Sequence, residues 1–105
     1  MFYKLEGHIP VKCKDVLEWA EWAANAEESR IVAQDEIDGL SVSTVFIGVE
    51  LACTLAGKPP LLFETMTFVN GKATGIAIRY ATWREAETGH RRMILKARNR
   101  DIAGD

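Results

Sequence analysis

The side chains that could perform acid–base, nucleophilic or metal chemistry are sparse in this sequence. His8 and His90 are the only histidines, and Cys13 and Cys53 are the only cysteines. Zinc sites are marked by close spacings such as Cys-x-x-Cys or His-x-x-x-His, and none of these four residues has such a neighbour. We therefore predict no metal site, no cofactor and no catalytic set. Because no export signal is visible, we expect both cysteines to be free, structural thiols.

One charged pair, Glu64 and Arg79, also needs an interpretation. In a hairpin that turns at Asn70-Gly71, these side chains lie diagonally across two strands, within reach of an ion pair. Such a pair on an open sheet face is more typical of a structural bridge than of a general acid–base site. Gly48 and Gly57 are too far apart to form a glycine-rich phosphate loop.

Two turn dipeptides, Asp38-Gly39 and Asn70-Gly71, indicate the strands that must position these residues. Each dipeptide lies between runs of strand-forming residues. Asn, Asp and Gly tolerate the positive φ angles of a two-residue type I′ turn. The sequence therefore predicts one β-hairpin over residues 30–47 and a second over residues 61–80. A short strand at residues 2–5 precedes both hairpins.

Two helices are indicated by their N-terminal caps and apolar stripes. Asp15 is followed three residues later by Glu18, and Thr82 is followed by Glu85, so each pair resembles a capping box. Apolar residues recur at helical spacing after each cap. Gly89 interrupts the second helix at a cost of about 1 kcal/mol against Ala. We expect this glycine to allow close packing of the helix on the sheet.

These elements predict a single α+β domain over residues 1–105. It contains an antiparallel sheet of four to five strands, built from two hairpins, with two helices packed on one face. Residues 48–60 show no periodic pattern. No apolar run approaches the roughly 20 residues that a membrane span requires, and the N-terminus lacks the apolar segment of a signal peptide. We therefore expect no membrane association and a cytoplasmic location.

Charge is divided unevenly along the chain, although the formal net charge is only −2. Residues 1–50 hold four basic and ten acidic residues, whereas residues 51–105 hold nine basic and five acidic residues. An acidic surface steers association with a basic partner, so we predict that the first half of the chain presents one. The acidic residues expected to face that partner are Glu18, Glu21, Glu27 and Glu28.

The basic run at residues 91–100 has two interpretations. It could contact phosphates, or it could complement the C-terminal dipole end of its own helix. The acidic balance of the whole chain and the lack of a recognisable nucleic-acid-binding motif favour the second interpretation. A nucleic acid is therefore not the expected partner.

The second hairpin presents an apolar row on the side away from the predicted core. Leu62, Met66 and Phe68 alternate on that outer face. Soluble monomers rarely leave such a patch uncovered, so we predict an interface there. A homodimer is the first choice, because two-fold pairing is the commonest solution for such a face. The alternative is that the segment from Gly48 to Gly57 folds over the row.

Three stretches of the chain carry a resemblance to known sequences. They are Val42-Ser43-Thr44-Val45-Phe46-Ile47-Gly48, Pro59-Pro60-Leu61-Leu62-Phe63-Glu64-Thr65-Met66 and Arg79-Tyr80-Ala81-Thr82-Trp83-Arg84-Glu85-Ala86-Glu87-Thr88-Gly89-His90. Together with the opening Tyr3 to His8 and the helix that holds Trp19 and Trp22, they resemble small uncharacterised α+β proteins of bacteriophages and prophages. The resemblance implies an accessory gene product that works in the bacterial host. It assigns no reaction and no catalytic residues.

These features lead to hypotheses from different functional classes. The first is a binding protein that occupies the surface of a host or phage protein, with inhibition of a bacterial defence system as one such role. The alternative is a self-associating structural module without catalytic activity. An enzyme ranks last, because no catalytic constellation is visible in the sequence.

Overall fold

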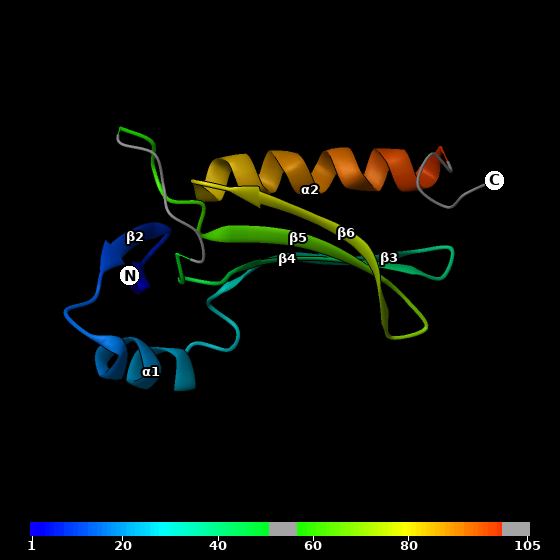
Figure 1. The fold of residues 1–105 in the computed structure, drawn as a ribbon. Helices are drawn as coiled ribbons and strands as arrows, with labels where there is room; N and C mark the ends of the chain where they lie inside the picture. The colour runs from blue at the N-terminus through cyan, green and yellow to red at the C-terminus, as the bar shows by residue number, and fades with distance from the viewer. Residues whose placement is uncertain (51–56, 100–105) are drawn as a thin grey trace.

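A computed structural model describes residues 1–50 and 57–99 (Figure 1). The elements in chain order are β1 (Tyr3–Glu6), β2 (Ile9–Lys12), α1 (Val16–Ala24), β3 (Ile31–Ile37), β4 (Leu40–Phe46), β5 (Phe63–Val69), β6 (Lys72–Tyr80) and α2 (Trp83–Arg98). Strands β3, β4, β5 and β6 form an antiparallel sheet in that spatial order, and β1 and β2 form a separate two-stranded sheet. The predicted α+β class and both hairpins are confirmed. No described helix is long and apolar enough to span a bilayer.

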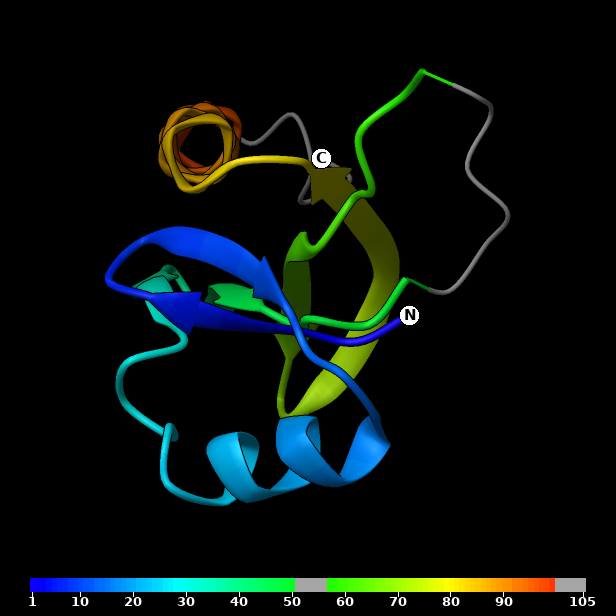
Figure 2. The ribbon, with the colours of Figure 1, turned by 90° about the vertical axis from the view of Figure 1, so that its left-hand side faces the viewer.

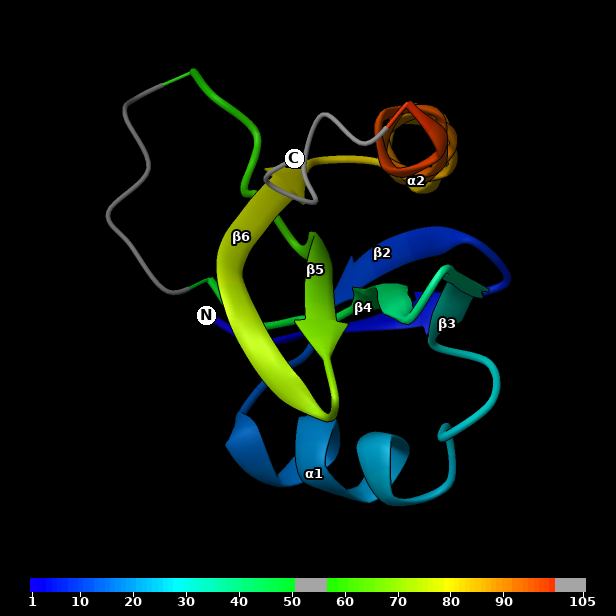
Figure 3. The same ribbon diagram turned by 90° about the vertical axis from the view of Figure 1, so that its right-hand side faces the viewer.

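The two helices do not share one face of the sheet, which corrects the prediction. Helix α2 lies across the four-stranded sheet and contacts all four of its strands (Figure 1). Helix α1 instead packs against β1 and lies on the opposite side of the sheet from α2 (Figures 2 and 3). The reason is that the N-terminal strand pairs with β2 rather than joining the main sheet, and α1 follows directly from that small hairpin.

The first hairpin has the predicted register. Asp38 and Gly39 have φ angles of 49° and 85°, as a two-residue turn with positive φ requires. Ile37 pairs with Leu40, and the predicted pairing continues as far as Ala33. A bulge then shifts the register before Ile31.

The second hairpin departs from its predicted register. Glu64 lies directly opposite Arg79, where simple counting from the Asn70-Gly71 turn placed the two diagonally. The shift arises because β6 has nine residues where β5 has seven, and the extra residues form a bulge that includes Gly75 at φ 97°. The ion pair itself is present, with Arg79 Nε 3.2 Å from Glu64 Oε2.

The core lies between the main sheet and α2 and continues beneath the N-terminal hairpin. Phe46 and Phe63 are fully buried, with ring centroids 5.0 Å apart. Trp22 meets the ring of Phe46 edge-on, and Trp83 meets Phe63 in the same way. A second buried cluster lies under the C-terminal half of α2 and consists of Leu40, Val42, Met93 and Ala97.

The N-terminal hairpin is joined both to the segment that follows β4 and to the start of α2. The backbone N–H of Tyr3 donates to the carbonyl of Gly48 at 2.7 Å. Gly48 has φ 71°, and a Cβ there would collide with the Tyr3 carbonyl and come within 2.9 Å of the Trp19 indole nitrogen, so only glycine suits the position. At the hairpin turn, the ring of His8 stacks on Trp83 with centroids 3.7 Å apart.

Candidate functional site

The face of the four-stranded sheet opposite α2, here called the outer face, carries two of the three predicted apolar interface residues. Met66 and Phe68 lie on it and are half-buried. Leu62 does not, because only 1% of its surface is exposed and it belongs to the core with Phe63. Leu62 precedes the first residue of β5, so the alternation of faces along the strand does not extend to it. Its inclusion in the interface was therefore wrong.

Met66 and Phe68 form a ridge, because their neighbours on both adjacent strands are small. On β4 the residues opposite them are Ser43 and Ser41, and on β6 they are Ala77 and Ala73. No described helix or strand lies over this half of the outer face, towards the hairpin turns (Figure 1). A hollow of about 550 Å³ lies beside Phe68 at the β3 edge of the same face.

The hollow has a polar wall towards β3. Gln34 donates to Ser43 Oγ at 3.0 Å, and Ser41 Oγ donates to Glu36 at 3.4 Å. The outer face therefore combines an apolar ridge with a hydrogen-bonding edge. This combination is typical of a surface that binds protein rather than a small apolar ligand.

Of the four predicted acidic residues, one forms an ion pair and the other three have no cation partner among the described residues. Glu18 is 2.9 Å from Lys4 Nζ and accepts the backbone N–H of Lys14 at 2.8 Å. These two interactions, that of the Lys14 N–H foremost, hold the pKa of Glu18 below its ordinary value. The remaining three are exposed and have no cation within 4.0 Å among the residues that the structure describes: Glu21, Glu27 and Glu28. Helix α1 lies on the outer-face side of the sheet, beside the end where β5 begins (Figure 1).

Beneath α2, the inner face of the sheet holds a chain of polar side chains that the sequence analysis did not predict. Asp35 Oδ2 lies 2.7 Å from His90 Nε2, and Nδ1 of the same ring lies 2.7 Å from Thr44 Oγ1. Thr44 Oγ1 is 2.5 Å from Thr65 Oγ1, which accepts the hydroxyl of Tyr80 at 3.1 Å. Thr44 and Thr65 are fully buried and His90 is 3% exposed, whereas Asp35 opens to solvent. We call this set the polar chain.

With a neutral imidazole at His90, the Asp35 carboxylate at one end and the Tyr80 hydroxyl at the other set the direction of the hydrogen bonds in the polar chain. A carboxylate only accepts, so His90 Nε2 donates to Asp35 and a neutral His90 accepts at Nδ1. Thr44 then gives its single hydroxyl hydrogen to His90 and must accept from Thr65. Thr65 in turn accepts from Tyr80. Every polar atom between sheet and helix along this path is therefore satisfied.

The Asp–His–hydroxyl order of the polar chain matches that of a nucleophile activated by a base. A nucleophile must be reachable, however, and Thr44 is fully buried. At the far end of the chain is the hydroxyl of Tyr80, a half-buried residue that lines a pocket. Four of the five members lie in the stretches on which the sequence resemblance rests: Thr44, Thr65, Tyr80 and His90.

A signal for the polar chain was present in the sequence. Thr44 and Thr65 occupy strand positions whose alternation assigns them to the core, and His90 lies on the apolar stripe of its helix. Three polar residues directed at one core indicate mutual hydrogen bonding, because buried polar groups are seldom left unpaired. The structure gives both ring nitrogens of His90 a partner.

The thiols and metal ligands add no second site in the described part of the chain. Cys13 is free and buried, and burial raises the pKa of its thiol. Cys53 lies outside the described residues. Within residues 1–50 and 57–99, no three His, Cys, Asp or Glu side chains come together as metal ligands do.

Comparisons of the chain with protein families, with curated protein sequences and with solved structures found no match.

Proposed function

We propose that this protein acts by binding another protein through the outer face of its sheet, without catalysis. The observation that carries the proposal is the ridge of Met66 and Phe68, which stands above small neighbours and is covered by no described element. Large apolar side chains that project between small ones act as anchors, because a partner can surround them and remove water.

The expected partner is a protein with a basic surface. Glu21 on α1 and Glu27 and Glu28 in the segment after it are exposed and have no cation partner among the described residues, and α1 lies on the same side of the sheet as the ridge (Figure 1). Such charge raises the rate of encounter with a positive patch and excludes acidic competitors. In keeping with the resemblance to phage and prophage proteins, we propose a host or phage protein as the partner, with inhibition of a bacterial defence system as the leading role and the host cytoplasm as the place of action.

A second copy of the chain is the alternative occupant. The outer face is self-complementary in shape, because the ridge on β5 is flanked by valleys of serine and alanine on both sides. Two-fold pairing places the ridge of one copy in a valley of the other. This arrangement describes a self-associating structural module.

The test compares Phe68→Glu with Leu95→Glu. Leu95 is 56% exposed on α2, on the far side of the sheet, so it is a matched control for adding a charge. Immobilised wild-type protein and immobilised Leu95→Glu should capture the same protein from a bacterial lysate. Phe68→Glu should bind that captured protein about 30-fold or more weakly than wild type does. Sedimentation of the purified wild-type protein at high micromolar concentration tests the self-association alternative, because a homodimer forms without any other protein. If folded Phe68→Glu behaves as wild type in both measurements, the outer face is not the binding surface.

A further inference from the structure

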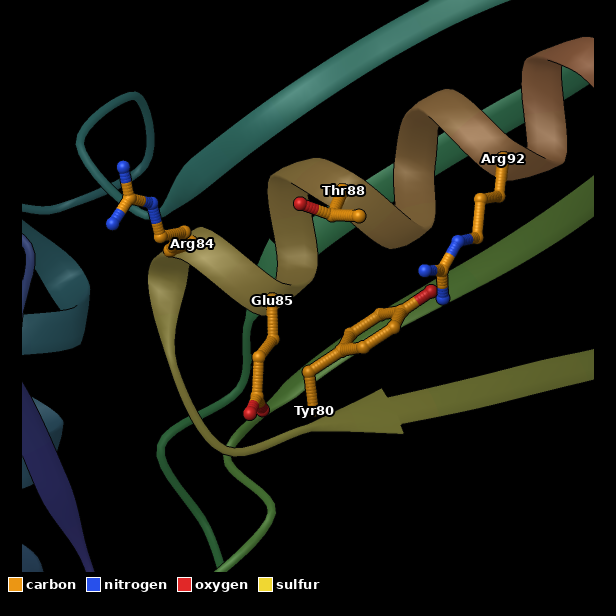
Figure 4. Close-up of a pocket in the computed structure, with 5 residues that line it drawn as sticks. All are labelled: Tyr80, Arg84, Glu85, Thr88 and Arg92. Atoms are coloured by element: carbon orange, nitrogen blue, oxygen red, sulfur yellow. The ribbon is translucent and has the colours of Figure 1, made fainter.

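A second pocket lies on the other side of the molecule, between α2 and the end of β6. It has a volume of about 370 Å³, and its lining includes Tyr80, Glu85, Thr88 and Arg92 (Figure 4). This volume is at the lower end of the range for small-molecule sites. The guanidinium of Arg92 lies beside the Tyr80 hydroxyl, whereas Arg84, at the rim, points away from both. In the part of the chain that the structure describes, no carboxylate comes within 4.0 Å of Arg92.

The tyrosine in this pocket is held rigidly. Its ring lies against Gly89 of α2 so closely that a Cβ at that position would overlap the ring. Its hydroxyl is fixed by the bond to Thr65 at 3.1 Å, at the end of the polar chain. A group that is already oriented loses little entropy when a ligand binds to it.

The direction of the polar chain determines which bond Tyr80 can offer a ligand. Its hydroxyl hydrogen is given to Thr65, so its oxygen faces the pocket as an acceptor. Glu85 supplies a second acceptor, since its Oε1 accepts the backbone N–H of Ala81 at 3.1 Å and its other oxygen accepts no hydrogen bond from the described residues. The pocket therefore offers the Arg92 guanidinium beside the Tyr80 oxygen at one end and the Glu85 carboxylate at the other, and no described carboxylate pairs with that guanidinium (Figure 4).

We propose that this pocket binds a phosphate group carried on a sugar, the chemistry of a sugar phosphate or a mononucleotide. Arg92 matches two phosphate oxygens with its paired N–H groups, and Thr88, whose hydroxyl accepts from Arg91 at 3.5 Å, lines the same wall. Tyr80 and Glu85 accept hydrogen bonds from the sugar hydroxyls. The negative charge of Glu85 also repels a bare anion. It therefore favours a ligand that carries hydroxyl hydrogen-bond donors beside its phosphate. The inference is independent of the outer face and goes beyond the proposed protein binding.

The test titrates the purified protein with inorganic phosphate, ribose 5-phosphate and adenosine monophosphate, and follows the Tyr80 ring and Arg92 side-chain signals by NMR. We expect saturable shifts with the two sugar phosphates and at least about tenfold weaker binding of inorganic phosphate. Arg92→Gln should weaken sugar phosphate binding about tenfold or more. Arg98→Gln removes the same charge from the same helix outside the pocket and should change binding by less than about twofold.

Tyr80→Phe distinguishes a built site from simple charge attraction. It keeps the ring packing and removes only the hydroxyl, so it should retain binding of inorganic phosphate and lose most of the preference for ribose 5-phosphate. Unfolding curves confirm that each variant is folded. Two results overturn the proposal: no saturable shift at about 10 mM of any probe, or equal losses from Arg92→Gln and Arg98→Gln. Neither result bears on the outer face, so the proposed function is tested separately.

Discussion

The two faces of the four-stranded sheet each carry side chains that are unusual for their position. The inner face buries Thr44 and Thr65 against His90 of α2, while the outer face leaves Met66 and Phe68 only half-buried. Exposed apolar residues are ordinary when scattered, but buried polar residues and a contiguous apolar ridge are informative. The polar groups of the inner face form a fully paired network with His90, whereas no described helix or strand covers the apolar ridge of the outer face.

This contrast separates the structural role of the inner face from the binding role that we propose for the outer face. A satisfied buried network selects one arrangement of helix on sheet, because any shift of α2 breaks several hydrogen bonds at once. Substitutions on the inner face should therefore change the free energy of unfolding. Substitutions on the outer face should change binding and leave stability nearly unaffected.

The strongest test of the contrast is His90→Ala. It removes the imidazole that joins Asp35 to Thr44, leaves a cavity under α2 and takes away the hydrogen-bond acceptor of the Thr44 hydroxyl. We expect the free energy of unfolding to fall by about 3 kcal/mol. Urea unfolding followed by circular dichroism and tryptophan fluorescence measures it. Arg98→Ala, on the same helix but exposed, is the control and should change stability by less than about 0.5 kcal/mol.

A double variant sharpens this prediction. Replacing both polar partners, as in Thr44→Val with His90→Leu, removes the unpaired hydroxyl and fills the space with apolar atoms. The pair should therefore be more stable than the sum of the two single changes predicts, by roughly 1 kcal/mol or more. Strict additivity would show that the two side chains do not act as a unit.

The next effect in size is that of Gly89→Ala. A Cβ at this position overlaps the Tyr80 ring, so either the helix moves away from the sheet or the ring leaves its place. We expect a loss of about 2 kcal/mol in the free energy of unfolding, even though alanine favours a helix more than glycine does. Glu87→Ala, an exposed change in the same turn, should be close to neutral. A Gly89→Ala variant as stable as wild type would contradict the close contact.

Sequence reasoning was strongest where a local turn governs the structure. Asp38-Gly39 determines the register of the first hairpin by its own backbone preferences, and counting outward from it holds as far as Ala33. Gly89 was correctly expected to allow close packing of its helix on the sheet. These features depend on backbone geometry within a few residues, and the residue types at those positions determine that geometry.

Sequence reasoning failed where distant strands decide the outcome. The bulge at Gly75 shifts the partners of β6, and nothing next to the Asn70-Gly71 turn indicates it. Leu62 lies just before β5, where alternation does not apply, so it turns into the core. The polar chain joins residues up to 55 positions apart, and only the paired strands and α2 bring them into contact.

On the outer face, a substitution at Met66 should change the free energy of unfolding only slightly and the affinity for the partner strongly. Met66→Ser shortens the ridge at a half-buried position, so the free energy of unfolding should fall by less than about 1 kcal/mol. Binding of the captured partner should weaken about tenfold or more. The same urea curves and a binding titration measure both quantities. A large loss of stability with unchanged binding would mean that Met66 belongs to the core and would reverse the contrast between the faces.

The smallest effect is expected at Glu18, where α1 meets β1. The Lys14 backbone N–H and the Lys4 ammonium lower the pKa of Glu18 from its reference value of 4.5. A carboxyl whose pKa is depressed by folding contributes stability above its unfolded pKa, and that contribution is lost as pH falls through the folded value. Stability should therefore decline below about pH 4.5 more steeply in wild type than in Glu18→Gln.

A two-dimensional NMR titration of the Glu18 side-chain carboxyl measures the pKa itself. In Lys4→Met the pKa should rise only partway towards 4.5, because the Lys14 N–H is the larger cause and remains. A complete return to 4.5 in that variant would assign the effect to the ammonium alone.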